Sequence, residues 1–230
     1  MEHTESLDER IKRRYEIAYK ELETDVKPIS DYILLDGIIN ENEYHKSTKI
    51  LWVLWEPYDK GGWEEYEWDT RKWINDSPFN SPTWKNISYT SYGILNNLSY
   101  EEIRNNLDLQ EILKVQRRIA YINVSKFPAE TTSRDRWSFL KAVYDKCNPE
   151  LLEQIHTYNP DIIIGGNSLY LFQNDLGLNK NSLAKIPFSR SIWEKDSKLF
   201  IDAHHPSRMG KSYCEEIIAA ALEWKNKHIN

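Results

Sequence analysis

Polar side chains that could do chemistry follow four apolar stretches of the sequence, each where the stretch ends. Glu56 follows the first stretch, Asn123 lies in the second, Asn167 follows the third and His205 follows the fourth. If the stretches are neighbouring parallel strands, their carboxyl ends meet at one edge of a sheet, where open α/β sheets bind ligands. A carboxylate, two amides and an imidazole at that edge would serve proton transfer and hydrogen bonding to a ligand.

The apolar stretches themselves predict buried strands, because near-continuous apolar runs are typical of parallel strands covered on both faces. The runs span residues 49–55, 119–124, 161–164 and 199–203. Helical patterns occupy about residues 83–98, 102–117, 135–158 with a break near Asn148-Pro149, and 211–228. Alternating strands and helices predict an α/β fold, a three-layer α/β/α sandwich around a mostly parallel four-stranded sheet.

The first 45 residues are predicted to form an extension ahead of this core. Ser6–Glu9 has the form of a capping box at the start of an amphipathic helix. Asp36-Gly37 lies between two short apolar runs, which is typical of a tight hairpin turn. We expect one domain over residues 1–230, with the extension over 1–45, the core over 46–230 and a long loop region over 56–82.

Composition indicates an ordinary folded chain without a membrane segment. Of 230 residues, 40% are hydrophobic and 29% are charged, and no apolar stretch approaches the ~18–20 residues of a membrane helix. The acidic start at Met1 lacks the features of a signal peptide, so we expect a cytoplasmic protein. Cys147 and Cys214 match no metal-binding pattern, which predicts reduced thiols in a packed interior.

Charge is unevenly distributed along the chain. Residues 1–113 hold 13 basic and 23 acidic side chains, whereas residues 114–230 hold 17 and 13. A polyanionic partner would therefore dock on the second half. The stretch after Glu56 has three more acidic than basic residues up to position 76. A phosphate backbone beside that stretch would be repelled, so either the stretch faces away from DNA or the substrate carries less charge than a duplex.

Residues 204–211 allow several interpretations. The simplest is a turn in which a proline sets the bend before the last helix. A metal site of Asp202, His204 and His205 is disfavoured, because adjacent side chains at a strand end point to opposite faces. A phosphate-binding loop at Gly210–Ser212 is excluded, because His205 stands where that motif requires its first glycine.

The strand ends also resemble the motifs of the uracil-DNA glycosylase superfamily. Leu54–Tyr58 (LWEPY) is similar to the first motif, GQDPY in the best-known branch, and His205–Met209 (HPSRM) is similar to the last, HPSPLS. A strand ending in Asn at 121–123 and a turn at 164–167 match two intermediate features. All four occur in the family's order over residues 49–212, and the resemblance implies that family's α/β/α fold.

The sequence also departs from the best-known branch of that family. Glu56 replaces an Asp, Trp55 replaces a polar residue and Arg208 replaces a second proline. Cysteines for an iron–sulfur cluster, which some branches carry, are missing, and the first 45 residues match nothing in the family. The longer Glu56 side chain would position water differently from an Asp.

The resemblance implies an enzyme that hydrolyses the N-glycosidic bond of uracil or another modified pyrimidine in DNA, without a metal or organic cofactor, after base flipping. His205 would stabilise negative charge on the departing base, and Glu56 would orient or deprotonate water. Asn123 and Asn167 would bind substrate, and Tyr58 would exclude a bulky C5 substituent. In the simpler interpretations, Glu56 is a solvated loop residue and Asn123 a turn amide at a strand end.

Further contacts are implied by the same resemblance. A ring that stacks on the base is expected from Trp68, in preference to Trp63 or Tyr66. Met209 aligns with a leucine that fills the gap left by the flipped nucleotide, although it is equally well explained as a core methionine. Contacts to phosphates are expected from Ser168, Ser207, Arg208 and Lys211.

Two other functions stay open at this point. One is a non-catalytic module of the same fold that binds nucleic acid or a protein, and the other is an N-glycosidase of free nucleosides, which the acidic stretch would suit. For the glycosylase we expect DNA as the partner, no membrane association and a monomeric state.

Overall fold

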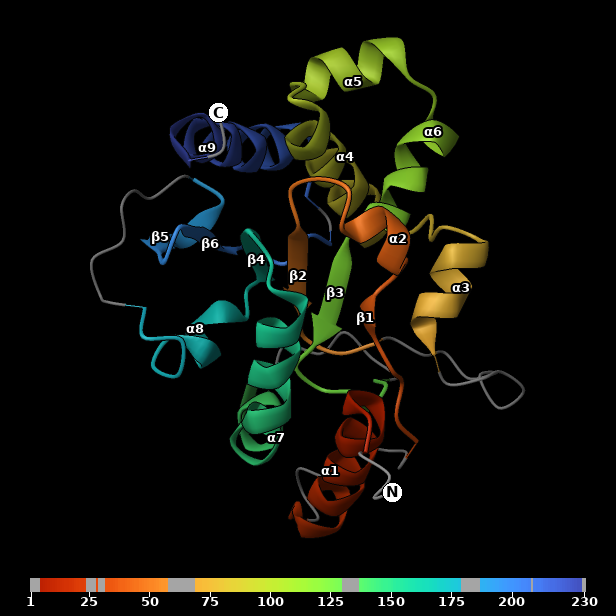
Figure 1. The fold of residues 1–230 in the computed structure, drawn as a ribbon, viewed down its shortest axis with the longest axis vertical. Helices are drawn as coiled ribbons and strands as arrows, with labels where there is room; N and C mark the ends of the chain where they lie inside the picture. Colours follow the sequence, from red (N-terminus) through yellow and green to blue (C-terminus); the bar gives the residue numbers. More distant parts are fainter. Residues whose placement is uncertain are drawn as a thin grey trace.

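The computed structural model of the chain describes residues 5–23, 28, 32–57, 69–129, 137–178, 187–207 and 209–228. In these residues the chain forms nine α-helices and a six-stranded sheet in the order β1-β3-β2-β4-β6-β5 (Figure 1). The inner strands are parallel to one another and comprise β2 (Ile50–Leu54), β3 (Ala120–Asn123), β4 (Ile162–Gly166) and β6 (Lys198–Ala203). The predicted α/β class and all four predicted strands are confirmed.

The prediction of a four-stranded sheet is too low, because the sheet has two further strands at its edges. β1 (Gly37–Ile38) pairs antiparallel with β3, and β5 (Ser189–Lys195) pairs antiparallel with β6. β1 is only two residues long, and β5 contains charged residues that interrupt any apolar run. Asp196 and Ser197 join β5 to β6 with φ angles of 51° and 55°, the left-handed conformation that two-residue hairpins favour.

Gly37 does not turn a hairpin, and that prediction is wrong. The residues on either side do not pair with each other; instead Gly37 lies opposite Tyr121 of β3, with a φ angle of 145°. Leu35 forms a parallel bridge with Asp69. The segment therefore crosses the edge of the sheet in extended form, and its pairing partners are distant in sequence.

Helices cover both faces of the sheet. On one face, α1 (Leu7–Glu21) and α7 (Trp137–Tyr158) lie side by side, as Figure 1 shows. Their buried side chains share a cluster with Leu51, Val53 and Ile163 of the sheet. On the other face, α4 (Pro82–Asn96) and α9 (Lys211–His228) pack on a cluster with Trp52 and Ile164. Successive side chains of each strand thus point to opposite faces of the sheet and pack in two separate cores.

Several helix predictions are confirmed and others need correction. α1 begins at the predicted capping box, with Ser6 accepting from the Glu9 amide, and α4 and α9 lie where predicted. The predicted helix at 102–117 is instead α5 (Tyr100–Asn106), α6 (Leu109–Leu113) and a 3₁₀ turn, η2 (Lys114–Arg118), because Asp108 caps a new helix.

The predicted break at Asn148-Pro149 is wrong, because α7 runs through Pro149 without interruption. A long buried face that includes Leu140, Cys147 and Leu151 compensates for the hydrogen bond that proline cannot donate. The predicted loop over 56–82 contains α3 (Thr70–Asp76), and residues 58–68 lie outside the described residues. Two short helices complete the fold, α2 (Glu41–Tyr44) and α8 (Leu169–Phe172).

Both cysteines are free thiols in the interior, as predicted. Cys147 belongs to the core beneath α7, and Cys214 belongs to the core beneath α9 on the other face. Burial raises the pKa of Cys147 to about 12 and that of Cys214 to about 11. Separately, no helix in the described part of the chain combines the length and apolar character needed to cross a membrane.

Replacing Gly37 by Ala tests the edge crossing. A Cβ at this position would overlap the hydroxyl of Tyr158, and the φ angle of 145° strains any other residue. We expect Gly37→Ala to lower the free energy of unfolding by about 2–4 kcal/mol in urea titrations. Gly210→Ala is the matched control, because a Cβ there has no neighbouring atom within 4 Å. Equal stability of the two variants would contradict the described path of residues 35–38.

Candidate functional site

The carboxyl ends of the inner strands bring the predicted polar residues to one edge of the sheet. Asn123, the last residue of β3, lies opposite Leu54 at the end of β2. Beyond the strands, the Ser125 amide donates to the Trp55 carbonyl at 2.8 Å, so the segment after β3 runs beside Trp55 and Glu56. Asn167 follows β4, and its backbone N–H donates to the Ala203 carbonyl of β6 at 2.6 Å. Adjacent strands are ~4.8 Å apart, so the ends of β3, β2 and β4 lie within about 10 Å of one another and the end of β6 lies about 15 Å from that of β3.

Trp55 links these strand ends through its side chain. Its indole nitrogen donates to the Asn167 carbonyl at 2.7 Å, and its ring meets the His205 ring edge-on with 6.3 Å between centroids. Gly166 gives the turn after β6 room to approach, since a Cβ there would lie 3.1 Å from both Pro206 and Leu54. Glu56 directly follows a residue that contacts His205, although about 150 positions separate the two in sequence.

His205 is mostly buried and electrically neutral. Burial lowers its pKa from 6.5 to about 4. The Ser207 backbone amide donates to His205 Nδ1 at 3.2 Å, so Nδ1 is an acceptor and the single ring proton sits on Nε2. The Ser207 hydroxyl lies 3.0 Å from the same nitrogen. The turn therefore fixes one tautomer, and Nε2–H is the group that can donate to a ligand.

Asn167 and Glu56 place buried oxygens at the same edge. Asn167 has a φ angle of 64°, and its Oδ1 is buried without a hydrogen-bond partner among the described residues. An unsatisfied buried acceptor costs about 1–3 kcal/mol, which a donor on a ligand would recover. Glu56 is half-buried, and its Oε2 is shielded from solvent. Each residue follows the end of an inner strand, Glu56 two positions after β2 and Asn167 directly after β4.

Asn123 is buried and bound to Asp36, a residue that sequence reasoning missed as part of a site. The backbone amide of Asn123 donates to Asp36 Oδ2 at 2.7 Å, and its side-chain Nδ2 donates to the same oxygen at 3.3 Å. The available signal was a lone Asp inside the apolar run from Ile33 to Ile39, because a buried carboxylate requires partners. The turn-forming character of Asp-Gly obscured that signal.

Three predicted DNA contacts have other roles or partners. Ser168 is fully buried and its hydroxyl donates to the Val53 carbonyl at 2.7 Å, so the prediction that it binds phosphate is wrong. Lys211 pairs with Glu101 and, at 3.5 Å, with Glu215, so its charge is already compensated. Met209 is partly buried against the core beneath α9, as expected for a core methionine.

Four predicted site residues remain, and the structure describes one of them. Ser207 is half-buried and bonded to His205, so it positions the imidazole. Tyr58, Trp68 and Arg208 lie outside the described residues.

A metal site at Asp202, His204 and His205 is not formed. The Asp202 carboxylate accepts the backbone amides of Ser168 and Leu169 at 3.2 and 3.0 Å, whereas the His204 side chain is exposed. Within the described ranges, no group of three or more His, Cys, Asp or Glu side chains is arranged to hold a metal ion.

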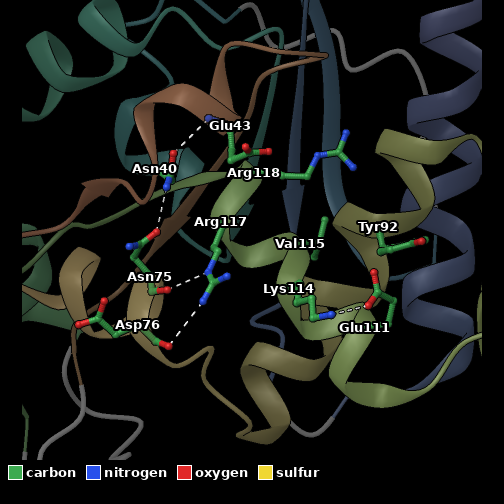
Figure 2. A pocket seen from close by; sticks show the side chains of 10 residues that line it. All are labelled: Asn40, Glu43, Asn75, Asp76, Tyr92, Glu111, Lys114, Val115, Arg117 and Arg118. Carbon is green, nitrogen blue, oxygen red and sulfur yellow. Dashed lines mark hydrogen bonds and ion pairs between the residues drawn. The ribbon is translucent and has the colours of Figure 1, made fainter.

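A surface cavity of about 730 Å³ lies elsewhere, at the amino end of β3 (Figure 2). Its cations are Lys114, Arg117 and Arg118, and they are matched by the same number of carboxylates, Glu43, Asp76 and Glu111. Its other lining residues are Asn40, Asn75, Tyr92 and Val115. The cavity shares no residue with the strand-end site, and its balanced charge gives no preference for an anion or a cation.

No known protein family has a model that matches this chain, and a search of curated proteins likewise finds no matching relative.

The protonation of His205 can be measured directly. Nuclear magnetic resonance of the imidazole should give a titration midpoint near pH 4, below the ordinary value of 6.5. Because the unfolded state binds the proton first, the unfolding free energy should fall as pH drops from about 6.5 to 4, by on the order of 2 kcal/mol. His205→Asn should lack this component. A midpoint near 6.5 in the folded protein would contradict the buried environment.

Proposed function

We propose that the protein is a DNA glycosylase that hydrolyses the N-glycosidic bond of uracil or another modified pyrimidine. The observation that carries this proposal is a neutral His205, with its proton on Nε2, at the same sheet edge as Glu56 and Asn123. The motif resemblance over residues 49–212 and a parallel inner sheet covered by helices on both faces support the same assignment. Under this proposal the sheet and its two helical layers form a three-layer fold of the uracil-DNA glycosylase type.

The reaction needs charge stabilised on both sides of the bond that breaks. As the bond between sugar C1′ and base N1 lengthens, its electron pair moves into the base and the sugar becomes cationic. His205 Nε2–H donates a hydrogen bond to the base oxygen that gains negative charge. A neutral imidazole suits this role because it donates a hydrogen bond without the desolvation cost of a charged imidazolium in a half-buried site.

Glu56 acts on the sugar side of the same bond. Its carboxylate favours the positive charge on the sugar and accepts a proton from the water that attacks C1′. The water oxygen and one of its protons stay on C1′ as the new hydroxyl group, and the other proton passes to Glu56. The base anion then takes up a proton from solvent while Glu56 releases its own, so the products are an abasic sugar and a free base and the net reactant is one water molecule. Asn123 binds the edge of the base, and Ser207 holds the His205 ring in its tautomer.

Nucleoside N-glycosidase activity is the second candidate, and a specific observation favours it. Lys211, at the start of the last helix, is already paired with Glu101 and Glu215, so it offers little attraction to a phosphate backbone. Affinity for duplex DNA that falls steeply with salt would favour the DNA substrate. Cleavage of free deoxyuridine with little salt dependence would favour the nucleoside.

Catalysis is tested with oligonucleotides that contain uracil, mismatched thymine or hydroxymethylated pyrimidines, in single- and double-stranded form. We expect alkali-labile abasic sites from the wild type. We expect kcat to fall roughly 100- to 1,000-fold in His205→Ala and roughly 100-fold or more in Glu56→Gln.

His204→Ala is the matched control, because His204 is the exposed neighbour of His205 and should tolerate the change. If the wild type is inert on every oligonucleotide and on free nucleosides but binds them, the protein is a binding module and the catalytic proposal is wrong.

A further inference from the structure

Asp36 and Lys126 form a buried ion pair next to the candidate site. Lys126 is fully buried, Asp36 is 1% exposed, and Lys126 Nζ lies 2.5 Å from Asp36 Oδ1. The Lys126 ammonium also donates to the Asn123 carbonyl and to Gln154 Oε1, each at 3.0 Å. All three ammonium protons therefore have acceptors, which is the condition under which a buried charge is tolerated.

The second oxygen of Asp36 faces Asn123. Oδ2 accepts the backbone amide of Asn123 at 2.7 Å and the side-chain Nδ2 at 3.3 Å. A carboxylate held by a lysine can only accept, so the amino group of the Asn123 amide must face Asp36 and its Oδ1 must face away. Asn123 Oδ1 accepts none of the hydrogen bonds that the structure gives between its described residues. The amide thus keeps an acceptor and one further N–H for a ligand.

The orientation of such an amide decides which base edge it matches. Uracil presents an acceptor at O4 beside a donor at N3, whereas cytosine presents a donor at N4 beside an acceptor at N3. An amide rotated by 180° exchanges its donor and acceptor, so a freely rotating Asn123 could match either base. With Asp36 in place, rotation would bring Asn123 Oδ1 against a carboxylate oxygen, which is repulsive.

We propose that Asp36 is a positioning residue that holds the Asn123 amide in one orientation and so restricts the site to one donor–acceptor order. The inference rests on the proposed function, under which that order is the one of uracil rather than cytosine. It also gives the N-terminal extension a role, because Asp36 lies directly before β1 in the segment that matches no motif.

Neighbouring residues hold Asp36 from its other side. Gln154 of α7 donates to Asp36 Oδ1 at 3.3 Å and to the Tyr158 hydroxyl at 3.1 Å. The Leu34 amide donates to the Lys126 carbonyl at 3.0 Å, which fixes the segment before Asp36 to the segment after β3. Lys126 Nζ holds Oδ1 and the backbone amide of Asn123 holds Oδ2, so the carboxylate stays in place even without Gln154 and cannot follow the Asn123 side chain if it rotates.

The test is Asp36→Asn. The introduced amide keeps its oxygen on Lys126, so its amino group replaces Oδ2 opposite the Asn123 backbone N–H and side chain. The acceptor that fixes the wild-type orientation is lost, and the rotated Asn123 side chain, with Oδ1 toward the new amino group, is favoured. We expect the ratio of kcat/KM for uracil over cytosine in otherwise identical oligonucleotides to fall by roughly tenfold or more. Gln154→Leu is the control, because it weakens the same buried network but leaves Asp36 Oδ2 on Asn123. It should lose stability without a change in that ratio.

A second measurement separates this inference from the proposed function. In nitrogen–proton spectra, the side-chain amide of Asn123 should be protected from hydrogen exchange in the wild type and in Gln154→Leu, and unprotected in Asp36→Asn. Absence of protection in the wild type overturns the positioning role, whether or not the protein is catalytically active.

The two failures remain distinguishable. An inactive wild type with a protected amide overturns the proposed function but keeps the fixed orientation of Asn123. An active wild type whose base preference is unchanged in Asp36→Asn overturns the role of Asp36 in specificity.

Discussion

The parallel pairing of β3, β2, β4 and β6 is the constraint on which the site depends. Parallel strands all end at the same edge, so whatever follows each strand is delivered to one place. The pairing places Asn123 opposite Leu54 and lets the turns after β4 and β6 meet over Gly166. The close packing at Gly166 fixes the positions of these two segments, and the segments then determine where their polar side chains lie.

Apart from the Glu56 carboxylate, the described side chains at this edge carry little net charge. His205 is kept neutral by burial, and Asp36 and Lys126 cancel each other. In such surroundings a hydrogen bond acts more strongly than it would in water, and an unpaired polar atom such as Asn167 Oδ1 is correspondingly costly. A ligand that supplies donors and acceptors in the right order is therefore selected by hydrogen bonding more than by net charge.

Much of this arrangement could be predicted from the sequence, and the features that could not be predicted have identifiable physical reasons. The inner strands were predictable because both of their faces are buried, which leaves long apolar runs such as Ile50–Leu54. The partner of Asp36 was not predictable, because Lys126 is 90 positions away and a single sequence carries no record of that contact. The burial of Ser168 was equally hidden, since nothing local distinguishes a serine that bonds a neighbouring strand from one that faces solvent.

The two cysteines lie in the cores on opposite faces of the sheet, so each can report on the packing of one face. Cys147 is on α7 and faces the core on one side of the sheet, and Cys214 is on α9 and faces the core on the other side. Because burial keeps both groups protonated, a thiol reagent at neutral pH reaches either one only after its own helix has lifted from the strands. The chain thus carries one natural label for the opening of each face, and their relative labelling rates report which face loosens first.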